Sequence, residues 1–129
     1  MTIVPESHLD LLERPIYGHF GTRRPDGFIQ VNPMWFLWDG SHIRLTHTTT
    51  RQKYRNIAAD PHVSLSVNDP DQPYRYLELR GTVVAVEPDP AGEFFQTLAR
   101  RYSLDRSGPP GDAADRVVLV IEPTAVSFQ

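Results

Sequence analysis

The sequence of 129 residues contains no cysteine. This absence excludes disulfides, zinc–thiolate sites, iron–sulfur clusters and thiol nucleophiles together. The five histidines show no spacing that is typical of metal ligands, so we expect no metal site. A chain without cysteine also suits the reducing environment of the cytoplasm, where we expect this protein to lie.

Long apolar runs are absent as well. No stretch approaches the about 20 consecutive apolar residues of a membrane-spanning helix, and the N-terminal residues contain acids instead of an apolar signal sequence. The chain carries 13 basic and 16 acidic residues, a net charge of -3, which argues against a general affinity for nucleic acid or anionic membrane. Any anion-binding site must therefore be local.

Motifs of common enzyme classes are missing too. The sequence has no Gly-x-Ser-x-Gly element, no Walker motif and no Rossmann glycine pattern. Glu87 and Asp89 border a proline-rich turn, which is typical of ordinary surface carboxylates. The sequence thus identifies no catalytic group with certainty, and a hydrolase is not indicated.

What the sequence does contain is a series of β-strand patterns in one domain over residues 1–129. Apolar alternation and turn residues predict strands over 16–22, 28–38, 41–48, 62–68, 74–87 and 116–128. Short helices are predicted over 7–13, 51–59 and 91–102, and a loop over 103–115. This order predicts a mainly β fold with short helices, a six-stranded antiparallel barrel that is closed or partly closed.

The stretch "THTTTRQKYRN" (46–56) joins the third strand to the second helix. Thr46 and Thr48 share one face of the strand because side chains alternate, and Thr50 is a natural N-cap for the helix. Arg51 and Lys53 then occupy the first helical turn without an acid, although cations are unfavourable at the positive end of the helix dipole. A phosphate there would meet hydroxyls, backbone N–H groups and cations.

An alternative stays open at this point, namely that Arg51, Lys53 and Arg55 only solvate an exposed helix face. His47 shares its strand face with Ile43 and Leu45, so we expect it to line the core of the barrel and not to bind a ligand.

The second strand carries an unusual mixture of polar and aromatic residues. Gln30 and Asn32 share a face, and they either meet polar atoms of a ligand or lie on a solvated surface. Pro33 predicts an edge strand or a bulge. Consecutive aromatic residues cannot all enter one core, so some of Trp35, Phe36 and Trp38 are expected to cover a partner or a ring-shaped ligand.

Three segments together resemble a known family: "DGFIQVNPMWFLWDG", "IRLTHTTTRQKYRNIAADPHVSLSV" and "YRYLELRGTVVAVEPD". They are similar to the split β-barrel flavin-binding proteins related to pyridoxamine 5′-phosphate oxidase, in particular to their coenzyme F420-dependent branch. The resemblance covers the chain from about Leu9 to the end, and its most specific part is the Arg-x-Lys-x-x-Asn element followed by "ADP".

This resemblance implies a homodimer with cofactor sites at the interface. It implies an F420-dependent oxidoreductase that transfers a hydride to a small, conjugated electrophile. The alternatives are an FMN-dependent oxidoreductase of the same fold, a non-catalytic flavin or deazaflavin carrier, and an oligonucleotide-binding barrel, which the net charge of -3 disfavours.

The resemblance also assigns roles to particular residues. The residues implied to hold the cofactor phosphate are Thr46, Thr48, Thr50, Arg51 and Lys53. Gln30 and Asn32 are implied to line the cofactor ring. Tyr74 and Tyr76 are implied to reach cofactor or substrate from the other subunit, and Tyr74 is a candidate proton donor.

Overall fold

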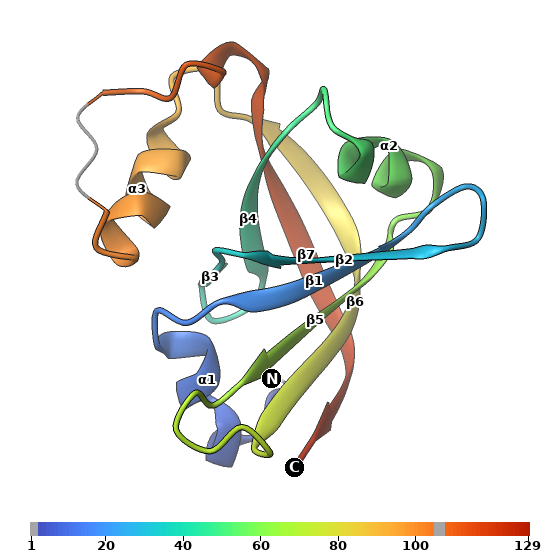
Figure 1. The fold of residues 1–129 in the computed structure, drawn as a ribbon, viewed down its shortest axis with the longest axis vertical. Coiled ribbons are helices and arrows are strands. Elements are labelled where there is room, and N and C mark those ends of the chain that lie inside the picture. Colours follow the sequence, from blue (N-terminus) through green and yellow to red (C-terminus); the bar gives the residue numbers. More distant parts are fainter. Residues whose placement is uncertain (1–2, 105–107) are drawn as a thin grey trace.

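The structure is a computed structural model that describes residues 3–104 and 108–129. Its central feature is one antiparallel sheet of seven strands in the order β2-β1-β5-β6-β7-β4-β3. The strands are β1 (Gly18–Arg23), β2 (Ile29–Met34), β3 (Leu37–Trp38), β4 (Ile43–Thr48), β5 (His62–Asn68), β6 (Tyr76–Pro88) and β7 (Arg116–Phe128). The sheet curls into a split barrel (Figure 1). The predicted fold class is therefore confirmed.

The number of strands differs from the prediction. The single strand expected over 28–38 is broken into β2 and β3, which lie at opposite edges of the sheet and pair with β1 and β4 respectively. The break falls at Trp35 and Phe36, and the Phe36 side chain is fully buried in the core. Pro33 lies in β2, which is an edge strand and pairs with β1 on one side only, as predicted.

Short helices lie around the sheet: the 3-10 helices η1 (Glu6–His8) and η2 (Ala113–Asp115), and the α-helices α1 (Asp10–Glu13), α2 (Gln52–Ala59) and α3 (Glu93–Arg101). In Figure 1, α2 and α3 lie toward one end of the molecule and α1 toward the other, near both termini. The loop predicted over 103–115 lies partly outside the described residues, and its last residues form η2.

Strands β6 and β7 are the longest, and a glycine permits their close pairing. A Cβ atom at Gly81 would lie 2.3 Å from the carbonyl oxygen of Glu122 on β7. The register of the β6–β7 ladder shifts between Arg80 and Gly81. This irregularity accompanies the curl of the sheet around its core.

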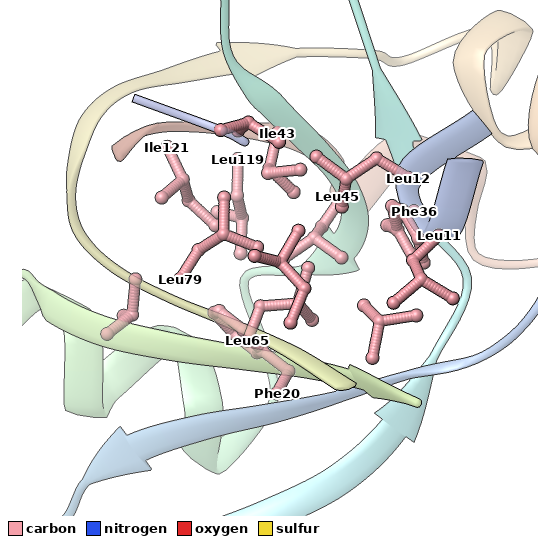
Figure 2. Close-up of a cluster of buried hydrophobic side chains, with 14 of the residues drawn as sticks. Leu11, Leu12, Phe20, Phe36, Ile43, Leu45, Leu65, Leu79, Leu119 and Ile121 are labelled. Atoms are coloured by element: carbon pink, nitrogen blue, oxygen red, sulfur yellow. The ribbon is translucent and has the colours of Figure 1, made fainter. Parts of the chain in front are cut away.

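The core lies inside the curled sheet and is closed by α1 and by Phe36. Leucine, isoleucine and phenylalanine side chains from α1 and from several strands meet there (Figure 2). The side chains labelled in Figure 2 are Leu11, Leu12, Phe20, Phe36, Ile43, Leu45, Leu65, Leu79, Leu119 and Ile121. Burial of this apolar surface is the main source of stability, and it holds β4 and β7 rigidly where the candidate site begins.

Two sets of hydrogen bonds attach helix α3 to this core. The Arg101 guanidinium donates hydrogen bonds to the carbonyl oxygens of Leu12 at 3.1 Å, Arg14 at 2.9 Å and Phe36 at 3.1 Å. At the other end, the buried Asp89 carboxylate accepts from the backbone N–H of Phe94 at 3.1 Å. Asp89 is thus a structural carboxylate that holds the start of α3, which corrects its interpretation as ordinary surface.

Candidate functional site

A cavity of about 470 Å³ lies where β4, the start of α2, α3 and the start of β7 meet the segment between β2 and β3. One side of it is cationic and the other is aromatic. The lining residues are Tyr17, Pro33, Met34, Trp35, Thr46, His47, Arg51, Lys53, Phe95 and Arg116. Among these lining residues there is no carboxylate.

Arg116, the first residue of β7, is the member of the cationic side that sequence reasoning missed. It pairs with Thr48 across the β4–β7 ladder, which brings it beside the junction. Asp112 holds its guanidinium through two contacts, of 3.0 and 3.1 Å. The group also lies 4.7 Å from the centre of the Phe95 ring and 3.4 Å from the Thr46 hydroxyl. An arginine fixed on several sides is suited to recognise an anion with a defined geometry.

Lys53 is held by an amide and not by a carboxylate. Its ammonium donates to Asn32 Oδ1 at 2.9 Å, and the same oxygen accepts from Gln30 Nε2 at 3.1 Å. Burial lowers the pKa of Lys53, and the nearby positive charge of Arg51 lowers it further. The cation is therefore kept in place without being neutralised, so that an incoming anion would be favoured.

The asparagine of the Arg-x-Lys-x-x-Asn element is an anchor for α2. Asn56 is fully buried, and its Nδ2 donates to Thr22 Oγ1 at 3.0 Å and to Gln30 Oε1 at 3.1 Å. Its Oδ1 accepts from Gln52 at 2.8 Å. Asn56, together with Ile57, occupies the buried face of α2, whereas Ala58 is exposed. This anchor fixes the rotation of the helix and so the direction of Lys53.

The start of α2 corrects one local prediction. The residue at the N-cap is Arg51, with extended backbone, and no side chain caps the helix. Thr50 instead donates its hydroxyl to Thr48 Oγ1 at 3.3 Å. An uncapped helix start presents N–H groups that a bound anion can satisfy.

His47 is buried, as its strand parity predicted, and it also lines the cavity. Its side chain is 3% exposed, and its buried Nε2 has no hydrogen-bond partner among the described residues. Burial lowers the pKa of His47 to about 4, and the charges of Lys53, Arg51 and Arg116 contribute to the same shift. The histidine is therefore neutral at pH 7.

The aromatic side is built from rings of three segments. Trp35 stacks on Tyr102 with ring centres 5.4 Å apart and lies 5.9 Å from Phe95. Tyr17, which is 57% exposed, also stacks on Tyr102, with ring centres 5.7 Å apart. The Tyr102 hydroxyl is fixed, since it donates to the Ile16 carbonyl at 2.8 Å and accepts from the Phe36 N–H at 3.1 Å. Such a rigid, flat wall suits a planar ring system.

The structure thus brings together some of the predicted phosphate-binding residues and separates others. Thr46, Arg51 and Lys53 line one cavity, and Asn32 with Gln30 reaches it through Lys53. Thr48 is buried and Thr50 is exposed, and neither lines the cavity. Arg55 turns away to Gln52 Oε1 at 2.9 Å and does not line the cavity.

The two tyrosines lie elsewhere in this chain. Tyr74 is 87% exposed and lines a different hollow together with His8 and Gln129. Tyr76 is the first residue of β6. A contribution of Tyr74 or Tyr76 to the site of a second copy stays a prediction.

A protein-family comparison decides where this fold and cavity belong. The family described as pyridoxamine 5′-phosphate oxidase matches residues 4–129. The chain belongs to the pyridoxamine 5′-phosphate oxidase family. The predicted resemblance is confirmed, and so is the prediction of an enzyme of the oxidoreductase class.

Solved structures agree with this family. A protein named F420 Reductase is 60% identical, with a TM-score of 0.95, and the match covers 98% of this chain and 100% of that one. A pyridoxamine 5′-phosphate oxidase-type protein from Listeria innocua is 21% identical, with a TM-score of 0.72 and 95% of each chain covered. An FMN-binding relative from Nostoc punctiforme is 13% identical, with a TM-score of 0.73, and covers 99% of this chain and 86% of its own. The last two show the shared fold. No curated protein matches the chain.

Two further features concern the part of the chain that the structure describes. It contains no cluster of three or more His, Cys, Asp or Glu side chains that could hold a metal ion. None of its helices has both the length and the apolar character needed to traverse a bilayer.

Proposed function

We propose that this protein is an F420-dependent oxidoreductase, which transfers a hydride from the reduced deazaflavin to a small, conjugated electrophile. The observation that carries the proposal is the presence, in one cavity, of a three-cation side and a rigid aromatic wall. The relative named F420 Reductase, at 60% identity over nearly the whole chain, supports the choice of this cofactor.

The residues of the cavity fit such a cofactor chemically. Arg51, Lys53 and Thr46 would hold its phosphate together with the uncapped N–H groups of α2, because charge-assisted hydrogen bonds are the strong ones. Asn32 would position Lys53, and Trp35 would pack near the ring. When bound, the deazaflavin supplies the hydride, and the protein supplies orientation and a dry environment.

The proton that completes the reduction has no assigned donor. We propose Tyr74 of a second copy as a candidate, since the residue is exposed in this chain and lies away from the chain's own cavity. Replacement by phenylalanine should lower turnover without changing cofactor affinity. Equal turnover in the two proteins would assign the proton to solvent or to a backbone group.

We further propose that the protein is a cytoplasmic homodimer. The face of the sheet formed by β1, β5 and β6 has a shallow hollow of about 600 Å³, and Ile29 and Val31 of β2 at its rim are exposed. Apolar groups of this kind, set beside polar ones, are typical of an interface between subunits. Analytical ultracentrifugation should give twice the chain mass for the native protein and one chain mass for Val31→Glu, and cell fractionation tests the location.

Binding of the two candidate cofactors to the purified protein tests the proposal. Fluorescence titration should show saturable binding of F420, and the reduced form should be oxidised when an enone or quinone is added. Tight FMN binding without a response to F420 would establish the FMN-dependent alternative. Binding of F420 without turnover over a broad panel of enones, quinones and tetrapyrroles would identify a carrier.

A further inference from the structure

His47 is surrounded by charged groups of one sign. It is on β4, on the strand face of Ile43 and Leu45, at the strand end that leads into α2. The charged residues that face it are Arg51 and Lys53 at the start of α2 and Arg116 at the start of β7. Asp112 pairs with Arg116, and Tyr17 is the remaining titratable lining residue. The lining residues from the β2–β3 segment and α3 are Pro33, Met34, Trp35 and Phe95, all uncharged.

Within the described part of the chain, the buried Nε2 of His47 lacks a hydrogen-bond partner, which is unusual for a buried polar atom. Native proteins pair nearly all buried polar atoms, and this one has no partner among the described residues. A leucine would fill the same space on a strand face that it shares with Ile43 and Leu45, without leaving a polar atom unsatisfied. The Nε2 that is unpaired among the described residues therefore indicates that His47 has a hydrogen-bond partner only when a ligand occupies the cavity.

We propose that His47 is a proton-linked part of the anion site: neutral in the free protein, it takes up a proton when an oxyanion binds between Arg51, Lys53 and Arg116. This inference rests on the cavity being the phosphate site of the proposed function. The proton comes from solvent, and no bond of the ligand is formed or broken. Phosphate and sulfate groups share the required chemistry.

The electrostatics give the sign of the linkage. Burial first, and then Lys53, Arg51 and Arg116, lower the pKa of His47 to about 4. A bound anion offsets the charge of the three cations and adds an opposite charge nearby, so the pKa of His47 rises. Linkage is reciprocal, so the anion binds more tightly as the pH falls toward the raised pKa. A rise to the ordinary value of about 6.5 makes binding about tenfold tighter at a pH of about 5.5 than at about 7.5.

Proton NMR of the wild-type protein tests the inference without relying on a variant. The imidazole C–H signals are followed between about pH 3 and 8, with and without sulfate, which stays a dianion over nearly all of this range. The spectrum of His47→Gln identifies the His47 signal. We expect the midpoint of His47 near pH 4 in the free protein and at least one unit higher with saturating sulfate.

Two results of this titration would overturn the inference. One is a His47 midpoint that sulfate leaves unchanged although sulfate perturbs the Lys53 signals. The other is the absence of sulfate binding at every pH in the range.

Cofactor affinity measured against pH separates this inference from the proposed function. The F420 affinity of the wild-type protein should rise about tenfold between a pH of about 7.5 and about 5.5, and in His47→Gln this rise should be lost. The ionisation of the ligand itself affects both proteins equally. If F420 binds with the same pH dependence in both, the proton link is wrong and the proposed function stands. If sulfate raises the midpoint of His47 but F420 does not bind, the proton link stands and the proposed function is wrong.

Discussion

Two groups of cations in this molecule have opposite surroundings. Near α1 and the β5–β6 loop, Arg75 pairs with Asp10 and with Asp69, and Arg14 lies 3.3 Å from the same Asp69 carboxylate. At the start of α2, Arg51 and Lys53 form no ion pair among residues 3–104 and 108–129. The first group contains its counterions, and the second does not.

The pKa values show the same contrast. The hydrogen bond from Arg75 lowers the pKa of Asp10, so the paired charges stabilise one another. Burial and the charge of Arg51 lower the pKa of Lys53, so the charges in the cavity oppose one another. Arg75 and its carboxylate partners contribute to the fold, whereas Arg51 and Lys53, which have no ion-pair partner among the described residues, favour the binding of an anion. Substitutions in the two groups should therefore affect different properties.

The largest effect is expected for Lys53→Met, which removes the charge and keeps most of the side-chain length. A charge-assisted contact contributes roughly 1.5–3 kcal/mol, so F420 affinity should fall about 10-fold to 100-fold. Fluorescence titration gives the dissociation constant, and thermal unfolding should show a fold as stable as before. Unchanged affinity would mean that Lys53 does not contribute to F420 binding.

A smaller loss is expected for Arg51→Ala. The residue is exposed at the N-cap of α2, where solvent weakens its interaction with a phosphate. We expect F420 affinity to fall up to about tenfold. The fall should be steeper at low ionic strength, since salt screens exposed charges. A loss that does not depend on salt would point to altered helix geometry and not to charge.

The paired group should respond in stability and not in binding. Arg75→Ala removes the guanidinium that Asp10 and Asp69 share, leaves Arg14 as the remaining cation beside them, and removes a hydrogen bond of 2.7 Å to the Ser7 carbonyl. The thermal midpoint should fall by a few degrees, while F420 affinity stays within about twofold of wild type. A clear loss of affinity in this variant would break the division between the two groups.

The smallest effect is expected for Arg55→Ala, the matched control for Arg51 and Lys53 on the same helix. Arg55 contacts Gln52 and the Thr50 carbonyl outside the cavity. F420 affinity should change by less than about twofold, and the change in stability should be within about 0.5 kcal/mol. If Arg55→Ala weakened binding as strongly as Lys53→Met, general surface charge would explain the binding better than the cavity does.

Much of the fold could be read from the sequence, because alternation and turn residues act locally. The patterns placed β4, α2, β5 and the long strand β6 close to their observed bounds. They could not divide 28–38 into two strands, because the division depends on which neighbours β2 and β3 find at opposite edges of the sheet. The burial of Asn56 could not be predicted either, since its partners Thr22 and Gln30 come from strands β1 and β2.

The sequence by itself determined that cations and hydroxyls gather where β4 leads into α2, because these residues are neighbours in the chain. Only the tertiary structure decided which of them share the cavity. Pairing of β4 with β7 adds Arg116, the Asn56 anchor directs Lys53 to Asn32, and Arg55 turns away toward Gln52. The same packing places the buried His47 beside three cations, which strand parity alone did not predict. The physical reason is that a charge depends on its neighbours in space, and strand pairing chooses those neighbours.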